Sequence, residues 1–238
     1  MSRVLPWLVI LAATAAEVAA QTPPHPTGAV SAGPWRITWS STGASARNRA
    51  SGQVVKLYDN EGDHTDYHRS YLVSVVGPVV SVQTHYNSES GPAHSSSGRW
   101  LEALRLEQRV GRAQVTDLFD SDDVLRALLQ VERIRCALEG HVPSSLDELV
   151  QQLPMECWTQ WSLLLESFAV MSVQRDTAVV SFSVPHGCEL AAGNVTRFDL
   201  RLRIPETRRR WFAEARAART LGMAPTAEDS WGGKCPSA

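Results

Sequence analysis

Two histidines in the charged segment 59–69 have a spacing that can bind a metal ion. His64 and His68 are four residues apart and would share one face of a helix, with the carboxylates of Asp63 and Asp66 beside them. Imidazole and carboxylate groups are common zinc ligands. The asparagine and glycine of the same segment favour a loop over a helix. We therefore expect a solvated polar loop, with a metal site as the alternative.

A second candidate is His94, which lies in a stretch rich in Ser, Gly and Pro. A nucleophilic serine needs a histidine base, a third group that orients this base, and an oxyanion hole. The sequence has no Gly-x-Ser-x-Gly nucleophile elbow. We expect the imidazole to bond to the loop backbone, with ligand binding as the alternative. The binding candidates are His94, Tyr86 and Ser88, and no catalytic residue is assigned.

The cysteines are the third set of residues that could do chemistry. They are Cys136, Cys157, Cys188 and Cys235. An even number in an exported chain indicates disulfides, and the zinc alternative lacks a Cys-x-x-Cys spacing. In the cytosol, Cys188 beside His186 would suggest a nucleophile, whereas outside the cell a disulfide is expected. Three pairings are compatible with the sequence, and we favour Cys157 with Cys188 and Cys136 with Cys235.

The amino terminus predicts export. Residues 1–20 have the pattern of a signal peptide, in which Arg3 precedes a short apolar core and small residues end at Ala20. Cleavage before Gln21 would release a periplasmic or secreted protein, and a retained anchor is the alternative. The apolar core is shorter than the roughly 20 residues of a membrane span. We expect no integral membrane segment after cleavage.

Composition sets the size and the charge of the domain. The chain has 238 residues, of which 43% are hydrophobic and 20% charged, enough for one domain with its own core. The net charge of -2 offers no basic field for nucleic acid. No cofactor is expected. Most of the eight tryptophans are expected in the core, with an aromatic platform for a glycan as the alternative.

The first half of the chain predicts β-structure. Trp35, Ile37 and Trp39 alternate with polar residues, and a second short strand is expected at Val54–Tyr58. Residues 43–52 are polar and predict a turn. Valines on both sides of the Gly77-Pro78 break predict a pair of half-buried strands, followed by a further strand near Trp100. The simplest interpretation is one antiparallel sheet.

The second half adds helices and a hairpin. We expect one helix from Ser121 to Gly140, another capped by Ser144 or Ser145, and a last helix that follows Pro205. A hairpin is expected around Arg175-Asp176, and a strand with one wet face over 198–204. The predicted organisation is a signal peptide at 1–20, a flexible leader at 21–34, a single α+β domain at 35–219 and a tail at 220–238. In this domain, helices would cover one side of the antiparallel sheet.

The central stretch resembles an exported bacterial domain family of unassigned function, which occurs in the extracytoplasmic part of lysozyme-sensing anti-sigma factors and beside a peptidoglycan deacetylase. Three motifs carry the resemblance: a Gly-x-Ala-His loop at Gly91–His94, a Thr-Asp-Leu-Phe at Thr116–Phe119, and a closing loop, strand and Ile-Pro from Gly193 to Pro205. The resemblance implies an antiparallel sheet packed against helices. The loop after His94 departs from the family pattern, and neither partner binding nor deacetylation is carried over to residues here.

These observations predict an exported domain that binds a cell-envelope protein or a peptidoglycan fragment without catalysis. The concave side of the sheet and the His94 loop are the first places to expect a ligand. The alternative is a small envelope hydrolase, metal-assisted through His64 and His68 or using His94. A hydrolase predicts titratable groups that converge in one pocket, whereas a binding domain predicts a shallower surface.

Overall fold

The computed structural model describes residues 27–60, 66–89, 95–107, 110–153, 161–184 and 196–224. In these residues the fold is a mixture of strands and helices, as predicted, and strands predominate. The prediction of one sheet is wrong, because the strands form three antiparallel sheets. We call them sheet A (β1–β4), sheet B (β5–β8) and sheet C (β9–β11).

The strands follow one another along the chain in an almost regular order. Sheet A contains β1 (Gly28–Ala32), β2 (Trp35–Trp39), β3 (Gly43–Asn48) and β4 (Val54–Asp59). Sheet B contains β5 (Asp66–Val76), β6 (Val79–Glu89), β7 (Ser95–Arg105) and β8 (Gly111–Arg112). Sheet C contains β9 (Phe168–Gln174), β10 (Thr177–Val184) and β11 (Thr196–Arg203), in the order β11-β10-β9.

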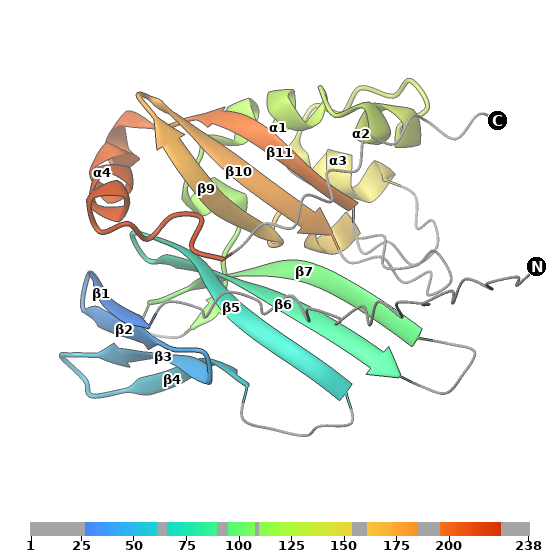
Figure 1. The fold of residues 1–238 in the computed structure, drawn as a ribbon. Helices are drawn as coiled ribbons and strands as arrows, with labels where there is room; N and C mark the ends of the chain where they lie inside the picture. The colour runs from blue at the N-terminus through green and yellow to red at the C-terminus, as the bar shows by residue number, and fades with distance from the viewer. Residues whose placement is uncertain are drawn as a thin grey trace, which may run out of the picture.

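Sheet B is the middle layer (Figure 1). One of its faces packs on sheet A, where Leu72 and Val80 share a core with Trp35 and Ile37. The other face meets sheet C through a cluster that includes Val73 and residues of β7 and β9. Residues 72–76 of β5 are therefore all buried, which explains why this run is nearly continuously apolar. The prediction of half-buried strands here is wrong for the same reason.

Helices lie on the far side of sheet C (Figure 1). They are α1 (Ser121–Leu128), α2 (Glu132–Ala137) and α3 (Leu146–Gln152), with 3₁₀ turns at Val115–Asp117 and Trp161–Leu163. The largest core joins their apolar sides to Phe168, Phe182 and Leu202. A further 3₁₀ turn, Glu206–Arg208, leads into α4 (Arg209–Ala217), which lies at the end of β5.

Several local predictions are confirmed. The Ser145 hydroxyl accepts a bond from the Glu148 amide and caps α3, and the hairpin turn at Arg175-Asp176 joins β9 to β10. In β11, Leu200 and Leu202 are buried while Arg201 is exposed. The expected single helix from Ser121 is two short helices, because the chain leaves the α-helix after Leu128 and restarts at Glu132.

Three segments that were predicted to be irregular contain strands. In the charged segment 59–69, residues 66–69 belong to β5. Residues 43–48 form β3, whose alanines at 44 and 46 are buried against sheet B. Residues 28–32, assigned to the flexible leader, form β1. Pairing with β2 supplies the backbone bonds that this Gly- and Ala-rich segment could not have formed alone.

The chain also stays packed beyond α4, in residues assigned to the tail. The Val75 amide donates to the Thr220 carbonyl at 2.9 Å, and the Met223 amide donates to the Val73 carbonyl at 2.8 Å. Thr220 and Ala224 are buried. Residues 220–224, which we call the sealing segment, therefore run along the edge of β5 and complete the domain.

Candidate functional site

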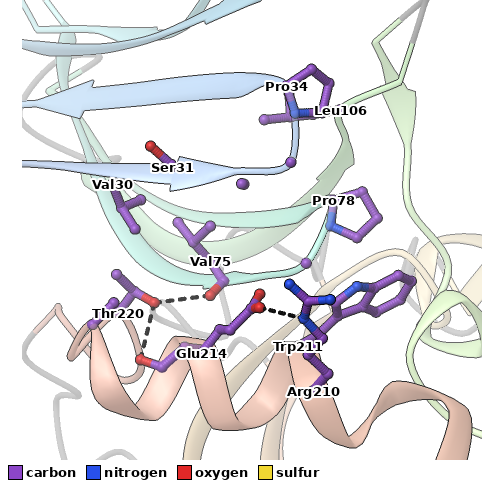
Figure 2. Close-up of a pocket in the computed structure, with 15 residues that line it drawn as sticks. Val30, Ser31, Pro34, Val75, Pro78, Leu106, Arg210, Trp211, Glu214 and Thr220 are labelled. Atoms are coloured by element: carbon purple, nitrogen blue, oxygen red, sulfur yellow. Dashed lines mark hydrogen bonds and ion pairs between the residues drawn. The ribbon is translucent and has the colours of Figure 1, made fainter.

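A groove separates the β1–β2 hairpin from α4 (Figure 2). Its volume is about 460 Å³, within the range of roughly 300–1,000 Å³ that is typical of ligand sites. We call it the β1–α4 groove. One wall is β1 with the hairpin turn, the other is α4, and the floor is the β5–β6 turn together with Val75 and Leu106.

The hairpin wall owes its shape to Gly33 and Pro34. Gly33 has a φ of 57°, and the proline ring holds the φ of the next residue near -65°. This sign pattern matches a type II′ turn, whose twist suits a two-residue hairpin. The turn places Ala32 opposite Trp35 and Ser31 opposite Arg36. Val30 and Ser31 line the groove from this side.

The floor and the helical wall are joined at Gly77. Its φ is 54°, and a Cβ atom added there would lie 2.5 Å from the Trp211 ring. Glycine is therefore required both by the turn and by the close approach of the indole. Leu106 is fixed against the same turn, because its amide donates to the Pro78 carbonyl at 2.8 Å. The floor is apolar and supported from below by sheet B.

Polar groups of α4 stand at the groove rim. Arg210 donates to Glu214 at 2.7 Å, and this hydrogen bond and the carboxylate charge raise the pKa of Arg210 above its usual value. The Arg208 guanidinium lies 5.2 Å from the centre of the Trp211 ring, a cation–π distance. At the other end, the Thr220 hydroxyl donates to the Val75 carbonyl at 2.9 Å. This wall is held by its own contacts.

The edge of β1 faces this groove without a neighbouring strand. In the described part of the chain, β1 pairs with β2 alone, and no backbone bond joins Ala29 or Ser31 to any other segment. Ladder bonds alternate along an antiparallel pair. Since Ala32 and Trp35 flank the two-residue turn, their pair is hydrogen-bonded, and Ala29 and Ser31 direct their N–H and C=O groups away from β2. The groove thus contains an unused row of backbone donors and acceptors.

A second hollow, of about 530 Å³, lies over the other end of sheet A. It is lined by β2, β3 and β4. Its polar groups pair with one another: Thr38 and Ser45 share a hydroxyl bond of 3.2 Å, and Lys56 pairs with Asp59. The Tyr58 hydroxyl donates to the Ser40 carbonyl at 3.2 Å. Because these groups are already satisfied, the β1–α4 groove is the better candidate.

None of the histidines and binding candidates that the sequence put forward is among the residues that line the β1–α4 groove. The backbones of His68, Tyr86 and Ser88 belong to β5 and β6, and His68 pairs in register with Tyr86; their side chains lie outside the described structure. His64 and His94 lie outside the described residues altogether. Among the side chains that are described, no three His, Cys, Asp or Glu residues gather as a metal site would require.

Of the cysteines, only Cys136 lies in the described residues, where it is half of a disulfide. Cys157, Cys188 and Cys235 lie outside these residues, so both favoured pairings stay predictions. Of the tryptophans that are described, Trp35, Trp39 and Trp161 are buried as expected, whereas Trp100 is half-buried. Trp211 is half-buried and lines the groove.

The groove residues were missed for identifiable reasons. The β1 residues belong to the segment predicted as a Pro- and Gly-rich leader. The alternation of apolar and polar residues on both sides of Gly33-Pro34 is nevertheless a hairpin signal. Gly77-Pro78 was recognised as a turn, but nothing local to it indicates Trp211, which comes from the other end of the chain.

No family model, curated protein or solved structure matches this chain. The described part of the chain has no helix long and apolar enough to cross a membrane.

Proposed function

We propose that this protein is an exported, non-catalytic binding protein, and that the β1–α4 groove receives an extended segment of a protein partner. The signal-like residues 1–20 support export. One observation carries the binding site: the open edge of β1 forms the wall of an apolar groove. Adding a strand to such an edge is a recurrent way to bind peptides, because main-chain bonds give affinity and pockets give selectivity.

The dimensions of the groove fit this mode of binding. A strand added beside β1 would lie about 4.8 Å from it, and its backbone would bond to the outward groups of Ala29 and Ser31. Every second side chain would point to the floor formed by Val75 and Leu106. The opposite wall, α4, would bound the peptide on its other side.

The test uses random dodecapeptides displayed on phage and selected on the full chain. We expect the selected peptides to slow amide exchange at Ala29 and Ser31. Ser31→Pro removes one outward N–H at an edge position where proline is tolerated, and should abolish binding. Ser31→Ala keeps the N–H and should bind as the wild type does. Selection of no peptide, or equal binding to the proline variant, would overturn the proposal.

The hydrolase alternative rests on His64, His68 and His94. The side chains of these residues lie outside the described structure. Zinc analysis of protein recovered from the periplasm tests the metal-assisted form directly.

A further inference from the structure

The outer face of sheet A carries a row of positive charge that begins at the groove. Ser31, Arg36 and Arg47 lie directly opposite one another on β1, β2 and β3. Both arginines are exposed. Like charges opposite each other on neighbouring strands are destabilising. In the described part of the chain no carboxylate forms an ion pair with either arginine.

The hairpin turn adds a third arginine to this wall. The Arg49 side chain donates to the Gly33 carbonyl at 3.3 Å, and the Arg49 amide donates to the Pro34 carbonyl at 2.8 Å. Both acceptors belong to residues that line the groove. The guanidinium is therefore held at the end of the groove, where its charge adds to that of Arg36 and Arg47.

The segment that contains the opposite wall has an excess of arginine over glutamate. Residues 206–219 contain five arginines and two glutamates, and the two glutamates are paired with Arg209 and Arg210. The chain as a whole has a net charge of -2. The charged residues that line the groove on this side, Arg210 and Glu214, neutralise each other. The positive charge beside the groove therefore lies on the hairpin side, and it suits a negatively charged partner.

Strand geometry says where the negative groups of a partner would lie. Successive side chains of a strand point to opposite faces. In a strand added to β1, one set would enter the apolar groove beside Val30. The other set would lie on the outer face, next to the short side chain of Ser31. Arg36 lies on β2, two strand spacings or about 10 Å from the added strand. Its side chain can extend over Ser31 toward the outer set of side chains. The separation is also comparable to the Debye length, so the charges still attract each other.

Resting on the proposed function, we infer that the partner segment alternates apolar and acidic residues. The apolar residues fill the β1–α4 groove, and the acidic residues pair with the row that begins at Arg36. A peptide fits better than another polyanion, because the backbone groups of β1 offer bonds that a sulfated glycan or a nucleic acid cannot match in register.

The experiment compares three capped eight-residue peptides, with alternating Val-Glu, Val-Lys or Val-Ser, by calorimetry on the full chain. We expect the Val-Glu peptide to bind at least tenfold more tightly than the Val-Lys peptide at low salt, with the ratio shrinking as salt rises. The double change Arg36→Ser and Arg47→Ser should weaken Val-Glu binding about two- to twenty-five-fold, since each exposed pair contributes about 1.4- to fivefold. Binding of the Val-Ser peptide should not change.

The matched control is Arg201→Ser with Arg203→Ser on β11. Both residues are exposed on a different sheet, so the net charge changes equally at a distance from the groove. We expect Val-Glu affinity close to that of the wild type. An equal loss in this control would mean that net charge alone acts, and would overturn the inference.

The two proposals can fail separately. If all three peptides bind equally and Ser31→Pro abolishes each, the site binds strands and the acidic preference is wrong. If the Val-Glu peptide binds Ser31→Pro as well as the wild type, the edge of β1 is not used and both proposals fall. Dextran sulfate serves as a probe without a peptide backbone. Tighter binding of dextran sulfate than of the Val-Glu peptide would favour a polyanionic partner and overturn the inference.

Discussion

Two strand edges in this molecule are treated in opposite ways. The edge of β5 is covered by the sealing segment, whose backbone bonds to Val73 and Val75. Among the described residues, no strand pairs with the outer edge of β1, which lies beside a groove. Exposed edges are a liability that proteins usually manage by covering or blocking them. The described residues thus cover one edge and not the other, and the proposed peptide site makes use of this difference.

The covered edge also holds two sheets together. Ser74 of β5 accepts a bond from the Val170 amide of β9 at 3.2 Å, and the sealing segment lies against both strands. A Cβ atom added at Gly222 would lie 2.7 Å from the Met171 carbonyl oxygen. This region therefore depends on close backbone contact. The hairpin of β1 has no comparable constraint at Gly33, where an added Cβ atom would meet nothing within 4 Å.

Gly222→Ala should give the largest effect. Gly222 and Gly33 share a φ of 57°, so alanine at either site carries a backbone cost of at least about 1–2 kcal/mol for the positive φ. At Gly222 the clash with the Met171 carbonyl adds about 1–3 kcal/mol. We expect a loss of about 3–4 kcal/mol in the free energy of unfolding, measured by urea denaturation. Gly33→Ala is the matched control, and equal losses in the two variants would contradict the importance of the seal.

Gly77→Ala should have a somewhat smaller effect of about 2–3 kcal/mol. Its added Cβ atom meets the Trp211 ring at 2.5 Å, and a side chain can move more easily than a carbonyl. The movement should displace the helical wall of the groove, so that Trp211 fluorescence and peptide affinity change as well. Adding Trp211→Ala to Gly77→Ala should restore part of the stability. No coupling between the two changes would show that the indole does not rest on the turn.

Thr220→Val tests the end of α4 at the seal. The change replaces a buried hydroxyl that donates to the Val75 carbonyl at 2.9 Å, and should cost about 1–2 kcal/mol. Thr220→Ser keeps the hydroxyl and should cost less. Amide exchange at Val75 should rise in the valine variant, while the amides of β2 stay unchanged. A uniform rise across both sheets would mean that the seal and sheet A open together.

How much of this could be predicted from the sequence differs between the two edges. The alternation of Trp35, Ile37 and Trp39 identified β2 directly, because period-two burial is a local signal. β1 has the same alternation in weaker form, hidden by small residues and by the prolines before it. Its conformation depends on pairing with β2, which composition does not report.

The three-sheet arrangement and the groove depend on contacts between distant segments. Leu72–Val76 is nearly continuous in apolar character, and only its burial between sheets A and C explains why. The sealing segment was predicted to belong to a tail outside the domain, because Thr220, Gly222 and Ala224 form no periodic pattern of burial. The histidine and cysteine sites were chosen by residue type, and the structure describes too few of their side chains to test them. The row of Arg36 and Arg47 could not be predicted, because it depends on which residues of β2 and β3 lie opposite each other.

Raising the pH should destabilise sheet A without affecting the sealing segment. This is the smallest effect on the free energy of unfolding that we expect. Burial raises the pKa of Tyr58 from 10.0 to about 12. A hydrogen bond from the Leu72 backbone opposes this shift, and the neighbouring Tyr71 adds to it. The folded state thus favours the neutral phenol. Its contribution to the free energy of unfolding is complete below pH 10 and is lost as the pH rises from 10 to 12. The loss at pH 11 should be at most about 1.4 kcal/mol. Urea denaturation at pH 9 and pH 11 should show this loss in the wild type beyond that in Tyr58→Phe, and equal losses in both proteins would exclude Tyr58 as its source.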